Sequence, residues 1–341
     1  MASGERNGEG EAWQAADIPM RWDSAGNGPG GEGTLWVDTH VHILPPRRMR
    51  GLVRWVKKFT PGFPVSEDIS AEEILASLRS SGIPLFFNLV FPLWEEETED
   101  LNRFNRELCG GIPEAVPFGS LHIETPDKER ETRRCIEEYG FMGMKLHPYA
   151  QRFPAFGEEM RPLFRVLDEH GRPLLVHTGF DAFYGMYMDL EEMERAIRDY
   201  PRMQVVAVHA LFPRFRLAHR LMGEYPNFWL DMTNTISCLR LHHHLKSQGN
   251  SLPASASSLE MEEVEKNLPW FHRLLEDFSD RIMYGTDFPV GFGYHPALLE
   301  DLRFFRLERK VEENLLAGAA GNLLARCGFG HLAEKLPAPG D

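Results

Sequence analysis

From residue 35 onward, short apolar runs alternate with longer amphipathic segments. The amphipathic segments repeat apolar residues every three or four positions, which predicts helices, and the short runs predict buried strands. We expect strands at residues 35–43, 83–90, 115–123, 141–147, 173–177, 204–211, 228–233 and 281–287. Alternating strands and helices are typical of βα units around a parallel sheet. Eight such units predict an α/β fold, a (β/α)8 TIM barrel, with a doubly wound open sheet as the alternative.

Local signals mark where several helices begin and end. Ser70 and Glu73 precede an apolar run with the spacing of a capping box. Gly140 and Gly171 directly follow expected helices, where a left-handed residue is favoured. We expect helices at residues 74–78, 99–108, 127–139, 160–170, 190–200, 215–225, 260–278 and 296–307.

Two connections are too long to be ordinary turns. Residues 44–65 contain several prolines, and residues 237–267 are rich in serine. Both follow the carboxyl end of an expected strand, the end where barrels build their active sites. We therefore expect loop insertions after strands 1 and 7 that serve as lids or pocket walls.

The patterned region is flanked by two segments without a clear period. Residues 1–33 are rich in glycine and acidic side chains, which predicts a flexible N-terminal segment. We expect the barrel domain to span residues 34–330 and a C-terminal tail to span residues 331–341.

Composition narrows the classes of partner. The chain carries 51 acidic and 37 basic residues, a net charge of −14, which disfavours nucleic acid because that binding needs clustered Lys and Arg. No apolar run approaches the roughly 20 residues of a membrane span. The four cysteines form no Cys-x-x-Cys pair, and no apolar leader opens the chain. We expect a cytoplasmic protein that binds a small-molecule substrate, and the sequence is compatible with a homo-oligomer.

Polar residues recur at the carboxyl ends of the expected strands. His40 and His42 end the first strand, where a period of two turns both imidazoles to one face. The other strand ends carry Lys145 with His147, His177, His209 and Asp287. A barrel brings these ends together around one pocket. A second His-x-His lies at His242 and His244, within the run of three histidines 242–244. We expect this run in a short helix, where consecutive side chains point in different directions, so it is a poor metal chelator.

These motifs resemble the amidohydrolase superfamily of metal-dependent barrel enzymes, in particular its amidohydrolase-related branch. The resemblance rests on four motifs in strand order, namely His-x-His in strand 1, Lys-Leu-His-Pro in strand 4, His-Thr-Gly in strand 5 and Gly-Thr-Asp-Phe-Pro in strand 8. The closing segment 314–324 is also similar. The resemblance implies that His40, His42, His177 and Asp287 bind a catalytic divalent metal.

The donor set agrees with that implication. Three imidazoles and a carboxylate suit zinc, which we expect first, and also manganese or iron. The ion would lower the pKa of bound water toward about 7 and so generate a nucleophile. Asp287 beside that water would act as the general base.

Lys145 and His209 have two interpretations. In binuclear members of the superfamily a carboxylated strand 4 lysine bridges two metals, and the strand 5 and strand 6 histidines bind the second ion. In mononuclear members the strand 6 histidine is catalytic, and an unmodified Lys145 would be a cation suited to a substrate carboxylate. We favour one metal, with Asp287, His209 and Lys145 as the catalytic residues.

Three further residues are assigned to substrate binding. His147 shares the pocket-facing parity of Lys145, and orienting a loop is its alternative role. Phe180 and Tyr184 follow strand 5 directly and would form an apolar wall, with loop packing as the alternative.

The sequence thus predicts a metal-dependent hydrolase that acts on a C–N or C–O bond of a small molecule. The first alternative is a metal-dependent decarboxylase, a lyase, of an aromatic or dienoic carboxylic acid. The second is a non-catalytic metal-binding barrel. The substrate itself depends on the two insertions, whose conformation the pattern leaves open.

Overall fold

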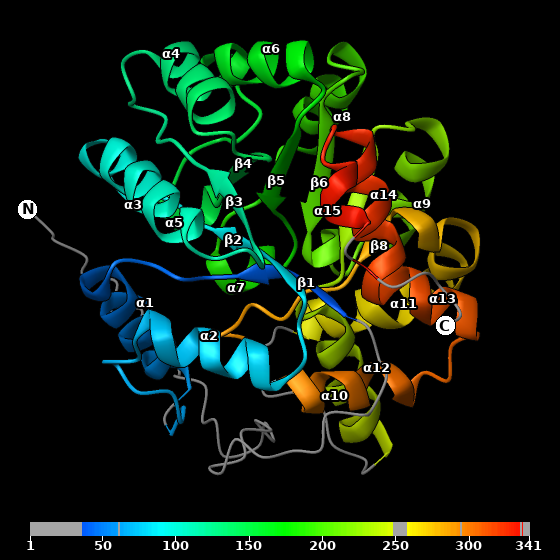
Figure 1. Cartoon of the computed structure of the whole chain (residues 1–341). Helices are drawn as coiled ribbons and strands as arrows, with labels where there is room; N and C mark the ends of the chain where they lie inside the picture. The colour runs from blue at the N-terminus through cyan, green and yellow to red at the C-terminus, as the bar shows by residue number, and fades with distance from the viewer. Residues whose placement is uncertain (1–35, 61, 248–257, 294, 335, 337–341) are drawn as a thin grey trace, which may run out of the picture.

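The computed structural model describes residues 36–60, 62–247, 258–293, 295–334 and 336. Eight parallel strands form one sheet in chain order, and the helices surround it (Figure 1). The strands are β1 Val37–Val41, β2 Leu85–Leu89, β3 Ala115–Gly119, β4 Gly143–Leu146, β5 Pro173–His177, β6 Gln204–Val208, β7 Phe228–Asp231 and β8 Ile282–Met283.

The sheet closes through the backbone that follows β8. Val41 pairs with Phe288 in a parallel bridge, and the His42 N–H donates to the Phe288 carbonyl at 2.8 Å. The Asp287 N–H donates to the His40 carbonyl at 2.9 Å. Because these bonds join the first strand to the last, the predicted (β/α)8 barrel is confirmed and the open sheet is wrong.

Helices connect successive strands on the outside of the barrel (Figure 1). The main ones are α2 Ala71–Ser80, α3 Thr98–Gly110, α4 Lys128–Arg133, α6 Arg161–His170, α8 Leu190–Asp199, α9 Phe215–Glu224, α11 Ser258–Phe278 and α12 His295–Phe304. Two short helices, α5 Pro148–Gln151 and α7 Asp181–Tyr184, follow β4 and β5. The chain then continues through α13 Arg309–Glu313, α14 Ala319–Arg326 and α15 Gly330–Ala333.

The local helix signals are confirmed. The Ser70 hydroxyl accepts from the Glu73 N–H at 3.2 Å, while the Glu73 carboxylate accepts from the Ser70 N–H at 2.8 Å, a complete capping box. Gly140 and Gly171 take φ values of 69° and 62°, the left-handed conformation that favours glycine.

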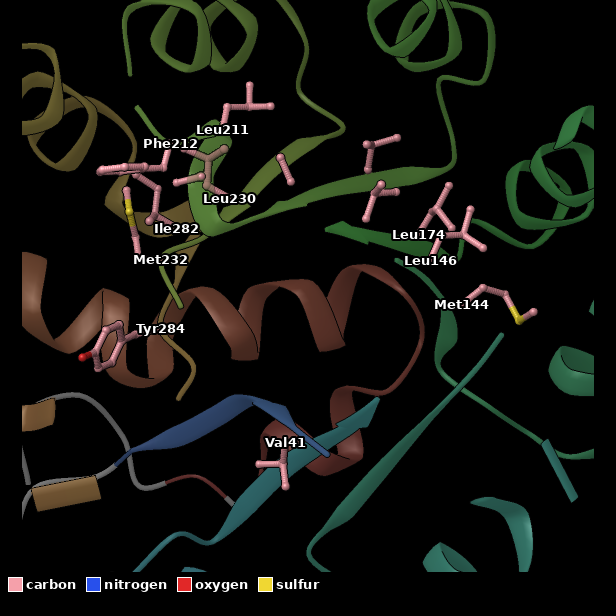
Figure 2. Close-up of a cluster of buried hydrophobic side chains, with 14 of the residues drawn as sticks. Val41, Met144, Leu146, Leu174, Leu211, Phe212, Leu230, Met232, Ile282 and Tyr284 are labelled. Atoms are coloured by element: carbon pink, nitrogen blue, oxygen red, sulfur yellow. The ribbon is translucent and has the colours of Figure 1, made fainter. Parts of the chain in front are cut away.

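Both sides of the strands are apolar. An outer cluster packs the strands against the helices and includes Leu146, Leu174 and Leu230, which Figure 2 shows with their neighbours. An inner cluster includes Leu175 and Trp229, the next residue in β5 and the preceding residue in β7. This alternation within one strand is what a closed barrel requires.

Insertions follow strands 1 and 7 as predicted, and their described parts contain helices. After β1, residues Pro46–Phe59 form helix α1, and Met49, Val53 and Val56 bury one face of it. Pro46 lies at the first helical position, where its fixed φ suits a helix, so the prolines are no evidence for a loop here. After β7, residues Thr235–Ser247 form α10, which packs beside α12 (Figure 1).

Seven of the eight strands are shorter than predicted, all but β5, and β1 is irregular. β3, β6 and β8 end before the predicted limits, so His209 and Asp287 lie beyond their strands in left-handed turns, with φ of 63° and 62°. In β1 the register shifts between Asp38 and Val41, the mark of a β-bulge.

The predicted domain limits stay predictions. Residues 1–33 lie outside the described residues, and helix α15 crosses the expected start of the tail at residue 331. Among the described residues, no helix combines the length and the apolarity that crossing a membrane would need.

Candidate metal centre

Three of the predicted ligands meet at the carboxyl end of the barrel. His40 Nε2 and His42 Nε2 are 3.2 Å apart, and Asp287 Oδ1 lies 3.6 Å from the first and 3.1 Å from the second. Both histidines are buried, and Asp287 is mostly buried. Within the described residues this is the single group of three His, Cys, Asp or Glu donors that could hold a metal ion.

The spacing fits a divalent ion. A tetrahedral ion with bonds of about 2.0–2.2 Å sets neighbouring donor atoms about 3.3–3.6 Å apart. His42 Nδ1 lies 2.6 Å from the Leu89 carbonyl, so Nδ1 carries the proton and Nε2 keeps its lone pair for a ligand. Burial, and then Lys145, lower the pKa of His40 well below its ordinary value, which favours the deprotonated form that a metal needs. The residues present therefore fit a metal.

Asp287 is held in place from two directions. Its Oδ2 accepts a hydrogen bond from the Asn234 amide at 2.8 Å, while Oδ1 faces the two imidazoles. Burial acts to raise the pKa of this carboxyl, but the neighbouring His40 and His42 hold it well below its ordinary value. The group is therefore a carboxylate at neutral pH.

Asp38 links the segment that carries His40 to the segment that carries Asp287. Its carboxylate accepts hydrogen bonds from the His40 N–H at 3.1 Å, the Thr286 N–H at 3.0 Å and the Thr286 hydroxyl at 2.6 Å. His295, at the start of α12, lies 2.9 Å from the same carboxylate. The β1 bulge accounts for this role, because it separates Asp38 from the face that His40 and His42 share.

His177 and His209 are paired beside this group. His209 Nδ1 lies 2.8 Å from the Thr233 carbonyl, and His209 Nε2 lies 3.0 Å from His177 Nδ1. A carbonyl can only accept, so His209 is protonated on Nδ1 and its Nε2 accepts from His177. His177 Nε2 is then a bare lone pair, and this buried atom has no hydrogen-bond partner among the described residues. His177 lies outside the three-residue group defined above.

Lys145 lies deep in the barrel. Its side chain is fully buried, and its Nζ has no hydrogen-bond partner in the described part of the chain. Burial lowers the pKa of Lys145 to about 8, against the opposing effect of Asp287 and Asp231. Asp231, at the end of β7, accepts from the Thr233 N–H at 2.7 Å and the Thr39 hydroxyl at 3.1 Å. Lys145 and Asp231 are therefore both buried and close enough to interact electrostatically, and burial raises the pKa of Asp231.

The predicted substrate residues surround the two histidines. The His147 ring stacks on the His177 ring, with 3.9 Å between the ring centroids. His147 Nδ1 accepts from the Ala150 N–H at 3.3 Å, which caps α5. Tyr184 meets the His177 ring edge-on at 5.2 Å, and Phe180 meets the His209 ring at 5.6 Å. All three therefore contact the site, and substrate binding by them stays a prediction.

Several residues of the site were not predicted from the sequence. Asp38 adjoins the His-x-His motif, and Asp231 ends a strand as the assigned residues do, so position alone could have indicated both. Tyr149 stacks on Tyr184 at 5.0 Å and donates to Asp181, and Asn234 lies in a left-handed turn. No pattern in the sequence points to the last two.

Comparisons with known proteins give the family and the fold of the chain. A family model described as amidohydrolase matches residues 37–324. Among curated proteins no relative matches the chain.

Solved structures share the fold at low sequence identity. An uncharacterized TIM-barrel protein from Bordetella bronchiseptica is 19% identical, with a TM-score of 0.58 over 86% of this chain and 100% of that one. A 5-carboxyvanillate decarboxylase from Novosphingobium aromaticivorans, complexed with manganese and a nitrobenzoic acid, is 14% identical, with a TM-score of 0.58 over 90% and 98%. A protein assigned as a 2-pyrone-4,6-dicarboxylic acid hydrolase from Pseudomonas putida is 18% identical, with a TM-score of 0.54 over 86% and 98%.

Proposed function

The chain belongs to the amidohydrolase family, and from that premise we propose that it is a metal-dependent hydrolase of a C–N or C–O bond in a small molecule. The observation that carries the proposal is the close approach of His40 Nε2, His42 Nε2 and Asp287 Oδ1, at 3.1–3.6 Å, at the end of the barrel where such enzymes react.

Four residues would hold the ion. His40, His42 and Asp287 supply three donors, and His177 is proposed as the fourth because its Nε2 is a buried lone pair without a partner among the described residues. Zinc is expected first, and manganese is the strongest alternative, since the Novosphingobium decarboxylase structure contains it. When bound, the ion would supply an activated water as the nucleophile.

The chain's own residues would then move protons and position the substrate. Asp287, a carboxylate at neutral pH, would accept a proton at the ion-facing site and return it to the leaving group. His209 is a neutral imidazole, because burial lowers its pKa to about 4, and as a catalytic residue it would orient His177 by accepting from the His177 Nδ1–H at 3.0 Å. Lys145 would attract an anionic group of the substrate toward the floor of the site.

A binuclear site is the alternative arrangement of the same residues. In this arrangement a carboxylated Lys145 would bridge two ions, and the second ion would be bound by His177 and His209, whose Nδ1 and Nε2 atoms lie 3.0 Å apart. We favour one ion because the described residues contain a single group of three donors.

A decarboxylase is the second candidate function. The aromatic rings of Tyr149, Tyr184 and Phe180 around His177 and His209 suit a flat unsaturated acid, and Lys145 suits a carboxylate. The Novosphingobium neighbour catalyses this class of reaction on 5-carboxyvanillate.

A substrate panel on metal-stripped and reloaded protein separates the candidates. Esters, lactones and amides are assayed by acid release, and aromatic and dienoic acids by carbon dioxide release. The proposal predicts acid release that returns with the metal. Carbon dioxide release alone would replace it with the decarboxylase, and a protein that binds metal without turning over any compound would support the non-catalytic barrel.

A further inference from the structure

Asn234 contacts Asp287 Oδ2, the carboxylate oxygen that does not face His40 and His42. It lies between the end of β7 and the start of α10, and its Nδ2 donates to Asp287 Oδ2 at 2.8 Å. The two residues are 53 positions apart in the chain. The contact therefore depends on the fold and is not a local turn.

The orientation of the Asn234 amide is determined by its partner. A carboxylate offers no proton, so the amide must direct its NH2 group, and not its oxygen, toward Asp287. The Asn234 Oδ1 is buried without a hydrogen-bond partner among the described residues. What the side chain contributes here is therefore the donor bond to Asp287.

The backbone at this position restricts which residue can serve. Asn234 has φ of 62°, in the left-handed region, where Asn and Asp are tolerated and most other side chains are strained. Its carbonyl also accepts from the Cys238 N–H at 3.0 Å, in the first turn of α10. The turn thus presents a short amide toward the site.

The two oxygens of Asp287 consequently have different surroundings. Oδ1 lies 3.1 Å and 3.6 Å from the Nε2 atoms of His42 and His40, whereas Oδ2 is bonded to Asn234. Resting on the metal-dependent function above, we propose that Asn234 is a positioning residue that keeps Asp287 a one-oxygen ligand.

The consequence concerns the open coordination position. A carboxylate that is free to rotate can bind an ion through both oxygens. A second oxygen on the ion would occupy the place that a catalytic site leaves for water or substrate. Asn234 would prevent this by occupying Oδ2.

Cobalt(II) substitution tests the proposal without an assay of turnover. The visible absorption of cobalt(II) weakens as its coordination number rises, so it reports whether Asp287 binds through one oxygen or two. Asn234→Gly removes the amide without straining the left-handed turn, and Asn234→Asp keeps the size but loses the donor. Arg306→Gly is the matched control, since Arg306 is exposed and also has a positive φ, of 49°.

We expect both Asn234 variants to bind cobalt with visible absorption lowered about twofold or more and with affinity lowered about tenfold. The Arg306 variant should match the wild type. A wild-type spectrum and affinity in Asn234→Asp would show that only the shape of the side chain matters and would overturn the proposal. A wild-type chain that takes up no cobalt would overturn the metal-dependent function and this inference with it.

Discussion

The two ends of the barrel differ although the same strands build them. Leu175 of β5 and Trp229 of β7 belong to the inner apolar cluster, which α14 completes at the amino end of the strands. Two residues further along the same strands, His177 and Asp231 are buried polar groups. The amino end therefore consists of packed apolar side chains, while the carboxyl end holds buried charged groups and imidazole lone pairs.

Left-handed backbone conformations cluster at the carboxyl end, where unpartnered buried polar atoms also lie. Lys145 Nζ and His177 Nε2 are buried without partners among the described residues. His209, Ala210 and Leu211 take positive φ values in succession. Such features cost stability and persist where the surrounding structure enforces them. The comparison teaches that the packed end stabilises a site that would not be stable alone.

The largest expected effect is on chemistry at the carboxyl end. Asp287→Asn should lower turnover about 10⁴-fold, because an amide cannot accept the proton and is a weaker ligand. Steady-state kinetics on the substrate found in the panel would measure it, with thermal unfolding as the check on folding. Persisting activity would assign the base to His209.

The next effect is on stability, in the inner apolar cluster. Phe118→Ala should lower the free energy of unfolding by about 3–5 kcal/mol, since it opens a cavity in the inner cluster. Urea unfolding measures this loss, and chelator competition should show that the folded variant keeps its metal affinity. A variant that loses affinity while fully folded would erase the distinction between the two ends.

Lys145 should make the free energy of unfolding depend on pH. Its pKa of about 8 in the folded chain lies below the ordinary value of 10.5, so the unfolded chain binds more protons between these values. The free energy of unfolding of the metal-free protein should therefore rise with pH across this window, by up to about 3 kcal/mol. Lys145→Met should lack this rise in urea unfolding at pH 7.5 and pH 10.5. Parallel profiles for the two proteins would contradict the buried lysine.

The smallest predicted effect separates a ligand from a neighbour. His177→Ala should lower metal affinity by more than about 100-fold, because the loss of a ligand costs more than the roughly 10- to 100-fold that follows when a residue that only orients a ligand is removed. His147→Ala is the control, since its ring stacks on His177 without being a proposed ligand. Equal affinity in the wild type and in His177→Ala would remove His177 from the ligand set.

The sequence predicts the barrel and most of the residues of this site. The period of two along a strand places His40 and His42 on one face, and a barrel brings Asp287, at another strand end, close to them. Both features can be recognised in the sequence because alternation and polar strand ends recur along the chain. Asn234 escapes prediction, since a left-handed turn places it. Asp38 adjoins the motif and could have been indicated by position, but its role could not, since a β-bulge separates it from the face that His40 and His42 share. Helix α1 escapes because its prolines resemble loop signals until Pro46 is seen at the helix start.

An anomalous-scattering map of crystals of the purified protein, collected at the absorption edge of the metal found by elemental analysis, tests the central claim most directly. The account predicts one divalent ion per chain, bound between His40, His42 and Asp287, and an unmodified Lys145. Two ions bridged by a carboxylated Lys145 would contradict the one-metal site. An empty site in crystals soaked with zinc or manganese would contradict metal-dependent function altogether.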